Sequence, residues 1–493
     1  MRNLLVLFTV LLVAAAGAAA ESTAILTPTE VSALQLPDVR ITSVKHHEAS
    51  ADSDPPRVAY LDVDGVIGKA IRFEILLPDE WNGRFAMGGG GGMVGSVQNG
   101  IRRSVHEGYA TSGTDTGHTS RGTDGSWALD DMVALVNFGH VAIHRTAEVS
   151  KAVIRAYYGK QPEKSYFVGC SRGGGQAMME AQRYPEDFDG IVGGAPAFNW
   201  TGFAALGIHI AQALYPDPDN MTKTVIDQED LDHLAAEIIK QTDEQDGLKD
   251  GIIGDPLGAK FDLAKVPGLT DEQRKAIQAL YDGPKNKDGQ IYPGFPIGPE
   301  GGRGGWFEWQ VGPIPGDLVN LGFGFSTNVF KYFVFQDPDW DYSTYNLDNW
   351  EEDTHLAGTV LDSVDPDLDA FKSRGGKLIL WHGWADAALP AQATIDYYEQ
   401  VLARDSEAMD YARLFMIPGC YHCGGGPGVS WVDWLAEIVK WVEQGKAPDQ
   451  IIATKRADDG SIVERPLFPW PASARYDGDG DPHDADNFLR VDP

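Results

Sequence analysis

Short apolar runs alternate with amphipathic stretches along most of this chain. The run KSYFVGC at 164–170 has the length and composition of a buried strand, and residues 173–185, which end at Pro185, have the pattern of a helix. Further segments in which a strand runs into a loop follow at 188–198, 375–386 and 411–419, and an amphipathic helix closed by Gly445 follows at 430–449. Strands separated by helices form a largely parallel sheet covered on its faces, so we predict an α/β fold.

The middle of the chain has a different texture. Residues 203–365 are rich in Asp, Gly and Trp, as in GPEGGRGGWFEWQVGPIPG at 298–316, and they interrupt the alternation of strands and helices. Long irregular segments in compact proteins are usually functional or disordered, and the aromatic content here favours order. We therefore predict a lid domain at 203–365, inserted into a catalytic domain made of residues 21–202 and 366–493.

The N-terminus, MRNLLVLFTVLLVAAAGAAAES, has the pattern of a secretory signal peptide. Arg2 precedes an apolar stretch, and small residues end at Ala20. We predict a signal peptide at 1–20 and a secreted or periplasmic mature protein. A retained membrane anchor is the alternative, but the apolar section is short for a span.

The charge balance narrows the range of partners. Lys and Arg number 40 and Asp and Glu number 72, so the formal net charge is −32. A surface of this sign repels phosphate backbones and anionic headgroups. We therefore expect neither nucleic acid nor a membrane as a partner.

The sequence GCSRG at 169–173 fits G-x-S-x-G, the pattern of a nucleophilic serine on a sharp turn between strand and helix. Ser171 would need a histidine base and an orienting acid. Asp386 and His422 each follow a predicted strand, in the chain order Ser, Asp, His that sheet-based hydrolases use. All three therefore lie at the carboxyl edge of the predicted sheet, where open α/β sheets bind ligands. We predict a serine hydrolase with this triad on an α/β-hydrolase core.

The chain has three cysteines, Cys170, Cys420 and Cys423. Cys170 directly precedes the predicted nucleophile and Cys423 directly follows the predicted base, so a disulfide between them would tie the two catalytic turns together. A local Cys420–Cys423 pair is the alternative, because CYHC is also a C-x-x-C motif of redox or metal-binding type. Redox C-x-x-C motifs usually open a helix in a thioredoxin-like context, which is absent here, so the first pairing is favoured and the second stays open.

A glycine-rich stretch, AMGGGGGMVGS at 86–96, allows three interpretations. Gly90, Gly92 and Gly95 match the G-x-G-x-x-G fingerprint of dinucleotide binding, which would indicate a nicotinamide-dependent oxidoreductase, but a lone match is weak evidence. A loop after an early strand that supplies an oxyanion N–H is favoured, and a structural turn remains open. We expect no redox cofactor.

The stretch TDEQDGLKDGIIGD at 242–255 gathers Asp243, Asp246 and Asp250 around one turn. Clustered carboxylates repel one another unless a hard cation lies among them, and Ca²⁺ prefers such oxygen ligands. The spacing is not that of an EF-hand. A structural Ca²⁺ site and a solvated acidic turn are both compatible with the residues alone.

Several motifs together resemble the tannase/feruloyl esterase family of secreted α/β-hydrolases. They are WNGRF (81–85), KSYFVGCS (164–171), FDGIVGGAPAFNW (188–200), YFVFQDPDWDY (332–342), HGWAD (382–386), PGCYHCGGGPG (418–428) and APDQI (447–451). The resemblance covers nearly the whole mature chain and implies esterase activity on aromatic acid esters.

The resemblance also assigns roles to single residues. It implies a Cys170–Cys423 disulfide and an oxyanion hole formed by the N–H groups of Gly92 and Arg172. The calcium ligands that it implies are Asp243, Asp246 and Asp250 with the backbone carbonyls of Leu248 and Ile252. Thr242 stands where many family members have a cysteine, so the lid disulfide is missing.

We therefore predict a secreted serine esterase of feruloyl esterase or tannase type, acting on esters of phenolic acids through an acyl-enzyme on Ser171. Hydrolysis of mono-esters of terephthalate-type diacids is the alternative, but no arginine near 322–330 is placed to pair with a second carboxylate. A catalytically inactive binding protein is the alternative that is not an enzyme.

His382 is expected to be a packed histidine. Six aromatic residues could line an acyl pocket or belong to the core: Trp306, Trp309, Phe323, Phe325, Phe330 and Phe333.

Overall fold

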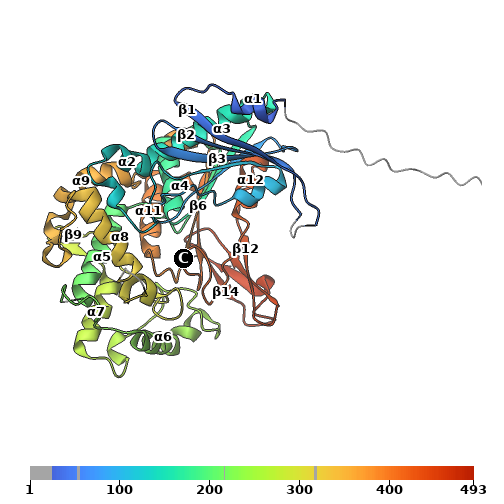
Figure 1. Cartoon of the computed structure of the whole chain (residues 1–493). Coiled ribbons are helices and arrows are strands. Elements are labelled where there is room, and N and C mark those ends of the chain that lie inside the picture. The colour runs from blue at the N-terminus through green and yellow to red at the C-terminus, as the bar shows by residue number, and fades with distance from the viewer. Residues whose placement is uncertain (1–24, 53–55, 216, 316–318, 493) are drawn as a thin grey trace, which may run out of the picture.

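The computed structural model describes residues 25–52, 56–215, 217–315 and 319–492 (Figure 1). The predicted signal peptide at 1–20 lies outside these residues. In the part that is described, no helix is both long enough and apolar enough to cross a bilayer.

Nine strands form one sheet in the order β1-β2-β3-β5-β4-β6-β7-β10-β11. β1 to β3 and β5 are antiparallel neighbours, and every pair from β5 onward is parallel. The strands are β1 (Val39–His47), β2 (Tyr60–Ile67), β3 (Ile71–Pro78), β4 (Arg84–Gly88), β5 (Ala110–Thr114), β6 (Lys164–Cys170), β7 (Gly190–Gly194), β10 (Lys377–Gly383) and β11 (Ala412–Ile417). The predicted α/β fold is confirmed, and the strand expected at 164–170 has these bounds.

Helices cover both faces of the parallel part of this sheet. They are α3 (Ala142–Tyr158), α4 (Arg172–Arg183) and α11 (Ala391–Arg404), and on the opposite face α12 (Trp434–Gln444). Successive strand residues point to opposite faces, so Phe167 joins the first buried cluster while Tyr166 packs with α12 in the second. Two covered faces explain why the central strands are apolar throughout rather than alternating with polar residues.

The chain between β7 and β10 is a largely helical insertion, which runs from green to orange in Figure 1 and includes the predicted lid. Its main elements are α5 (Trp200–Leu214), α6 (Gln228–Thr242), α7 (Asp271–Asp282), the hairpin of β8 (Lys285–Asn286) and β9 (Gly289–Gln290), α8 (Leu321–Asn328) and α9 (Trp350–Leu361). α5 packs against α7, α8 and α9 and so lies at the centre of the insertion. The division into domains at 203 and 365 stays a prediction.

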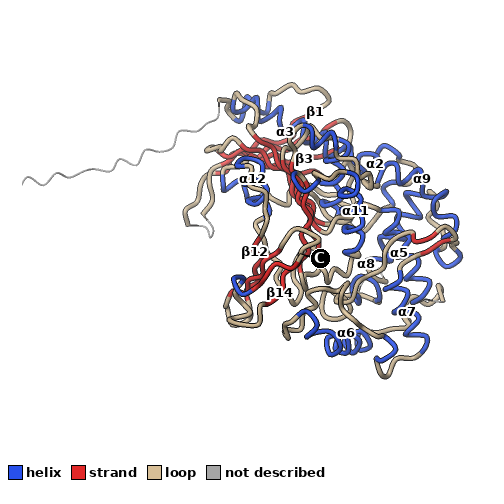
Figure 2. Tube along the Cα trace, turned by 180° about the vertical axis from the view of Figure 1, so that it is seen from behind, coloured by secondary structure: helices blue, strands red, loops and turns tan. Residues whose placement is uncertain are grey.

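The C-terminal residues add two hairpins outside the main sheet, seen below it in Figure 2. They are β12 (Ile451–Arg456) with β13 (Ile462–Leu467), and β14 (Ser473–Tyr476) with β15 (Phe488–Val491). The described residues also form the short α-helices α1 (Pro28–Ser32), α2 (Met132–Val136) and α10 (Asp369–Ser373), with several 3₁₀ and π turns. The first hairpin packs beside the loop that follows β11, because Thr454 pairs with Trp431.

Candidate active site

Ser171 occupies the sharp turn between β6 and α4. Its backbone has φ 61° and ψ −121°, a region that a residue with a side chain rarely adopts. The two flanking glycines make the turn possible, because a Cβ at Gly169 would lie 2.4 Å from the carbonyl oxygen of Gly173. The G-x-S-x-G pattern is therefore explained by close backbone packing around a half-buried serine that lines a cavity.

Asp386 and His422 come together from the loops after β10 and β11. His422 Nδ1 lies 2.7 Å from Asp386 Oδ2, and the Asp386 carboxylate is fully buried. Its other oxygen, Oδ1, accepts the backbone N–H groups of Ala388 at 2.8 Å and Leu389 at 3.0 Å. These contacts fix the carboxylate in one orientation and, through it, the imidazole ring.

His382, expected to be a packed histidine, is buried and also contacts Asp386. Its Nε2 lies 3.1 Å from Asp386 Oδ2, and its Nδ1 lies 2.8 Å from the hydroxyl of Thr394. Burial acts to raise the pKa of Asp386, but the charge of His422 and the hydrogen bonds of both histidines outweigh it and hold that pKa below its usual range. His382 therefore helps to keep the carboxylate ionised, a role that its four-residue spacing from Asp386 could have suggested.

Cys170 and Cys423 form a disulfide, with their Cα atoms 5.9 Å apart, so the predicted pairing is confirmed. Cys420 remains a buried thiol, and burial raises its pKa to about 12. The C-x-x-C alternative is thus excluded. The bridge joins the residue before Ser171 to the residue after His422.

Ser171 and His422 line one cavity of about 150 Å³ beneath the lid. The lining residues are Gly92, Ser171, Arg172, Ala197, Trp200, Phe203, Trp309, Phe325, Ala388, Leu389, His422 and Cys423. The ring of Trp309 meets that of His422 edge to face at 5.1 Å. The described residues include no hydrogen bond between Ser171 and His422; such bonds are often long in enzymes until a substrate is in place.

The backbone N–H groups around Ser171 are nearly all engaged. From Gly89 to Gly95, every N–H except that of Gly92 donates to an acceptor in the described part of the chain. Arg172 is the first residue of α4, where the N–H has no acceptor within the helix. Gly92 and Arg172 line the same cavity as Ser171, so the predicted oxyanion donors are compatible with the structure and stay a prediction.

The side chain of Arg172, unlike its backbone N–H, has a structural role. Its guanidinium is fully buried, lies 4.4 Å from the ring centre of Phe138 and 5.5 Å from that of Trp200, and donates to the carbonyls of Phe138 and Gly139. Burial lowers its pKa to about 9, although Asp362 opposes this. The side chain therefore anchors the start of α4 beneath the cavity wall.

The glycine-rich stretch does not open an α-helix, since a 3₁₀-helix follows only at Arg102–Glu107. The dinucleotide fingerprint requires a helix at that point, so the structure lacks its context. A Cβ at Gly89 would lie 2.6 Å from Gly173 Cα, which shows that the loop packs directly on the turn of Ser171.

The six aromatic residues considered for the acyl pocket divide into two groups. Trp309 and Phe325 line the cavity, whereas Trp306, Phe330 and Phe333 are core residues and Phe323 packs against Tyr215 and Tyr342. Trp200 and Phe203 of α5 line it too; no motif in the sequence connects α5 with the site.

The acidic turn at 242–255 brings its three aspartates around the backbone. Asp243 accepts the N–H of Gly251 at 2.7 Å, and Asp246 accepts that of Gly254 at 2.7 Å. Burial, with repulsion from Asp250 and Asp243, raises the pKa of Asp246 although backbone hydrogen bonds oppose this. The three carboxylates are not among the acidic groups of the described residues whose oxygens lie within 4.8 Å of one another, and Asp250 is paired with Arg465, so the Ca²⁺ site stays a prediction.

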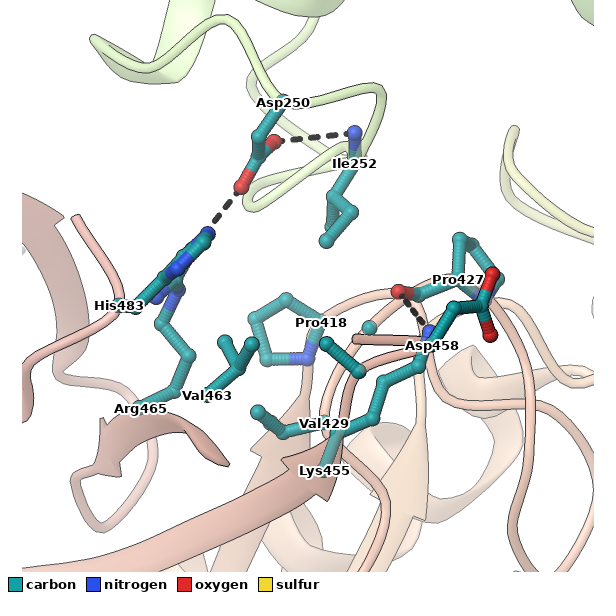
Figure 3. Close-up of a pocket in the computed structure, with 12 residues that line it drawn as sticks. Asp250, Ile252, Pro418, Pro427, Val429, Lys455, Asp458, Val463, Arg465 and His483 are labelled. Atoms are coloured by element: carbon teal, nitrogen blue, oxygen red, sulfur yellow. Dashed lines mark hydrogen bonds and ion pairs between the residues drawn. The ribbon is translucent and has the colours of Figure 1, made fainter. Parts of the chain in front are cut away.

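Asp250 of the same turn also faces the C-terminal hairpins across a cavity of about 270 Å³ (Figure 3). Its Oδ2 accepts Arg465 Nη2 at 3.0 Å, and Lys455 Nζ donates to the carbonyl of Pro427 at 2.7 Å. This larger cavity contains none of the triad residues. Its walls include residues of the acidic turn and residues of the loop that carries His422.

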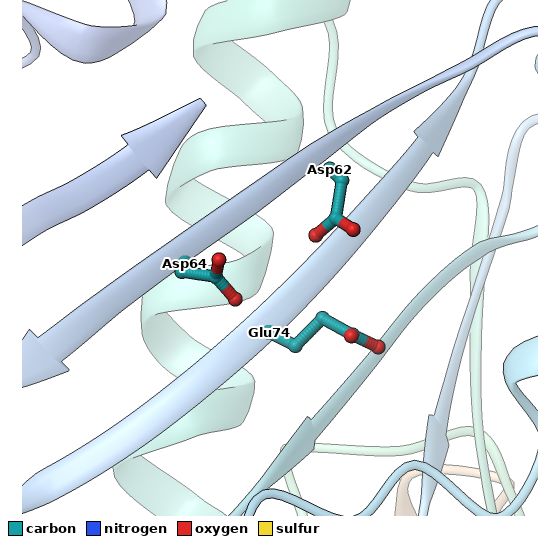
Figure 4. Close-up of side chains that lie close together, drawn as sticks. All are labelled: Asp62, Asp64 and Glu74. Atoms are coloured by element: carbon teal, nitrogen blue, oxygen red, sulfur yellow. The ribbon is translucent and has the colours of Figure 1, made fainter. Parts of the chain in front are cut away.

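In the described part of the chain, three acidic side chains whose oxygens lie within 4.8 Å of one another occur at Asp62, Asp64 and Glu74 (Figure 4). Arg102 lies among them, with Nη2 3.4 Å from Asp62 and Nη1 paired with Glu74. Burial, then repulsion from Asp62, raises the pKa of Asp64. The guanidinium accounts for this cluster on β2 and β3.

The family model of tannase and feruloyl esterase matches residues 61–491. The chain belongs to this family. Membership identifies the tannase-family protein as a carboxylic ester hydrolase, as predicted from its motifs.

Individual relatives agree with this assignment. The tannase-family protein is 33% identical to the mono(2-hydroxyethyl) terephthalate hydrolase of Piscinibacter sakaiensis, over 88% of this chain and 85% of that one. It is 33% identical to a probable feruloyl esterase of Arthroderma benhamiae, over 84% and 80%. Its fold matches the crystal structure of feruloyl esterase B from Aspergillus oryzae with a TM-score of 0.82 at 26% identity, over 93% and 98% of the two chains.

Proposed function

We propose that this protein hydrolyses carboxylic esters of aromatic acids through an acyl-enzyme on Ser171. The observation that carries the proposal is the cavity in which Ser171, His422 and two free N–H groups meet aromatic walls. Its volume of about 150 Å³ suits a single benzene-sized ring. The acyl group therefore enters with its ring among Trp200, Phe203 and Phe325.

The reaction follows from the positions of these groups. Ser171 Oγ attacks the ester carbonyl carbon while His422 takes its proton, and Asp386 holds the imidazole and stabilises its charged form. The negative charge on the carbonyl oxygen is held by the N–H groups of Gly92 and Arg172. His422 then gives the proton to the leaving alcohol, and a water molecule releases the acid by the same steps.

The walls favour a neutral acyl group. Arg172 is the cationic residue among those that line the cavity, and its guanidinium is bonded to backbone carbonyls behind the wall. A phenolic acyl group such as feruloyl or galloyl would need no second cation. The identity with a mono(2-hydroxyethyl) terephthalate hydrolase supports mono-esters of aromatic diacids as the second candidate.

The test uses chromatography to monitor the acid that is released from methyl ferulate, methyl gallate and mono(2-hydroxyethyl) terephthalate. We expect one phenolic acid to be released by the wild type and none by Ser171→Ala. Labelling by a fluorophosphonate separates an esterase from an inactive binding protein, because it requires an activated serine. A folded wild type that neither labels nor releases acid would overturn the proposal.

We also propose a structural Ca²⁺ in the acidic turn, held by Asp243, Asp246 and Asp250 with the carbonyls of Leu248 and Ile252. The three aspartates on one turn support it, as does the pKa of Asp246, which burial and added repulsion from Asp250 and Asp243 raise. We expect a chelator to lower the Tm by several degrees, since saturating a site contributes about 2.7 kcal/mol at a hundredfold excess over Kd. Asp246→Asn should abolish the difference and Asp255→Asn, a neighbouring carboxylate outside the set, should keep it. A Tm that changes neither with chelator nor with added calcium would contradict the proposed calcium site.

We further propose that the protein is exported and that its first 20 residues are removed. The sequence pattern at 1–20 supports this. N-terminal sequencing of protein recovered outside the cytoplasm should begin at Glu21. Recovery only of the full chain from membranes would favour an anchor instead.

A further inference from the structure

Two glutamine side chains hold the glycine-rich loop next to Ser171. Gln176 lies on α4, is 1% exposed, and accepts the N–H of Gly90 through Oε1 at 3.1 Å. Gln98 accepts the N–H of Gly91 through Oε1 at 2.7 Å. Each amide oxygen thus fixes one of the two residues that lead into Gly92.

The backbone fixes the loop on both sides of these contacts. Gly89 donates to the carbonyl of Val168 at 2.9 Å, and Met93 donates to that of Gly122 at 2.7 Å. The N–H of Gly92 is therefore the one left over, and its direction is set by neighbours that cannot turn independently. Gly92 itself has φ 57°, so its N–H points differently from a regular extended strand.

We propose that Gln176 and Gln98 are positioning residues that aim the Gly92 N–H at the oxyanion. The inference rests on the proposed function, in which that N–H stabilises the tetrahedral intermediate. Gln176 also belongs to the helix whose first residue, Arg172, supplies the second donor. One buried side chain therefore keeps the two donors in a fixed relation to each other.

The choice of glutamine has a chemical reason. The N–H groups of Gly90 and Gly91 need acceptors, and a carboxylate would also serve as one. A buried negative charge beside a developing oxyanion would oppose catalysis, whereas an amide oxygen accepts the hydrogen bond without net charge. The site thus gains a rigid loop at no electrostatic cost to the transition state.

The test compares Gln176→Met with the wild type. Methionine has a similar volume and no acceptor, so the Gly90 N–H loses its partner and the loop can turn. We expect kcat to fall about 10- to 100-fold, somewhat less than for loss of an oxyanion donor, with KM within about twofold. The affinity for an aryl boronic acid, which forms a tetrahedral adduct with Ser171, should fall by a similar factor. The affinity for the product acid should not change.

Two further variants separate positioning from stability. Gln182→Met changes a hydrogen-bonded glutamine in the last turn of the same helix, away from the loop, and should leave kcat and boronic acid affinity unchanged. Gln176→Glu keeps an acceptor oxygen but adds a negative charge beside the anionic adduct, so its boronic acid affinity should stay below that of the wild type.

Equal losses of boronic acid and product binding in Gln176→Met would show a merely structural role and overturn the inference. So would unchanged boronic acid binding. A wild type that fluorophosphonate does not label would instead defeat the proposed function on which the inference rests.

Discussion

Asp386 is the residue on which the electrostatics of the site converge. It is fully buried, contacts two histidines through one oxygen, and accepts two backbone N–H groups through the other. A buried carboxylate with so many donors stays ionised, because each donor favours the charged form. The charge on Asp386 is therefore available to stabilise the imidazolium that forms at His422.

Asp386→Asn tests this charge with little change of shape. The amide cannot stabilise a positive imidazole and favours the wrong tautomer, so we expect kcat to fall about 10³- to 10⁴-fold. KM should change little, since the cavity walls stay in place. The measurement is steady-state release of acid. Activity within tenfold of the wild type would contradict the assignment of Asp386.

Glu180 is a buried acid outside the catalytic site. It lies on α4 at 0% exposure, and its two oxygens have no hydrogen-bond donor among the described residues. Burial raises its pKa well above 4.5, and the nearby Asp187 adds to the shift. The folded protein therefore holds a proton that the unfolded chain releases as pH rises.

This gives a stability prediction with a definite sign. Above about pH 4.5 the unfolded state ionises Glu180 and the folded state does not, so wild-type stability falls with rising pH until the raised pKa is reached. Glu180→Gln removes this loss. Thermal melts should show no gain at pH 4 and a gain of roughly 1–3 °C at pH 8. Glu80→Gln, at an exposed position, serves as the control, and a gain that does not grow with pH would refute the explanation.

Between elements, the disulfide joins the β6–α4 turn to the loop after β11. The two cysteines are 253 residues apart in sequence, so the bridge closes the whole insertion between β7 and β10 and the flanking strands β7, β10 and β11 into one loop. It also holds the backbone on both sides of the catalytic pair. We therefore expect it to serve geometry as well as stability.

Replacing both Cys170 and Cys423 by serine should lower the free energy of unfolding by about 2–4 kcal/mol. Activity should fall further than the folded fraction does, because the turn of Ser171 and the loop of His422 become independent. Urea unfolding and acid release measured on the same samples test this. Cys420→Ala, which removes a buried thiol and keeps the bridge, is the control. Full activity in the folded double variant would limit the bridge to stability.

Over the whole molecule, the charge of −32 sets the long-range field that a substrate meets. Such a field repels anionic esters before they reach the cavity and has little effect on neutral ones. Salt screens it, because the Debye length falls to about 10 Å at 0.1 M. The charge should therefore act on substrate choice as well as on solubility.

The prediction compares an anionic and a neutral ester at two ionic strengths. Raising NaCl from about 10 mM to about 300 mM should lower KM for mono(2-hydroxyethyl) terephthalate about 2- to 5-fold. KM for methyl ferulate should change by less than about 1.5-fold. The same shift for both esters would indicate an effect on the protein and not on the approach of the substrate.

The fold class, the chain order of Ser171, Asp386 and His422, and the motifs of the family can all be predicted from the sequence alone. These follow from local rules, since a nucleophile turn needs its glycines in sequence and parallel strands end at a common edge. The sequence favoured the Cys170–Cys423 bridge over the C-x-x-C pair. The contacts of His382 with Asp386 and of Trp309 with His422 could not be predicted, because each depends on which segment packs beside it.

The surroundings of the triad depend on how distant segments pack in the folded protein. α5 brings Trp200 and Phe203 to the cavity, and Gln176 on α4 and Gln98 hold the loop of Gly92. Packing also places the Arg172 side chain behind the cavity wall, where the sequence had suggested only a backbone donor. The local pattern of apolar and polar residues determines which residues are buried and which strand ends hold catalytic residues. Contacts between segments far apart in the chain form only when the core packs.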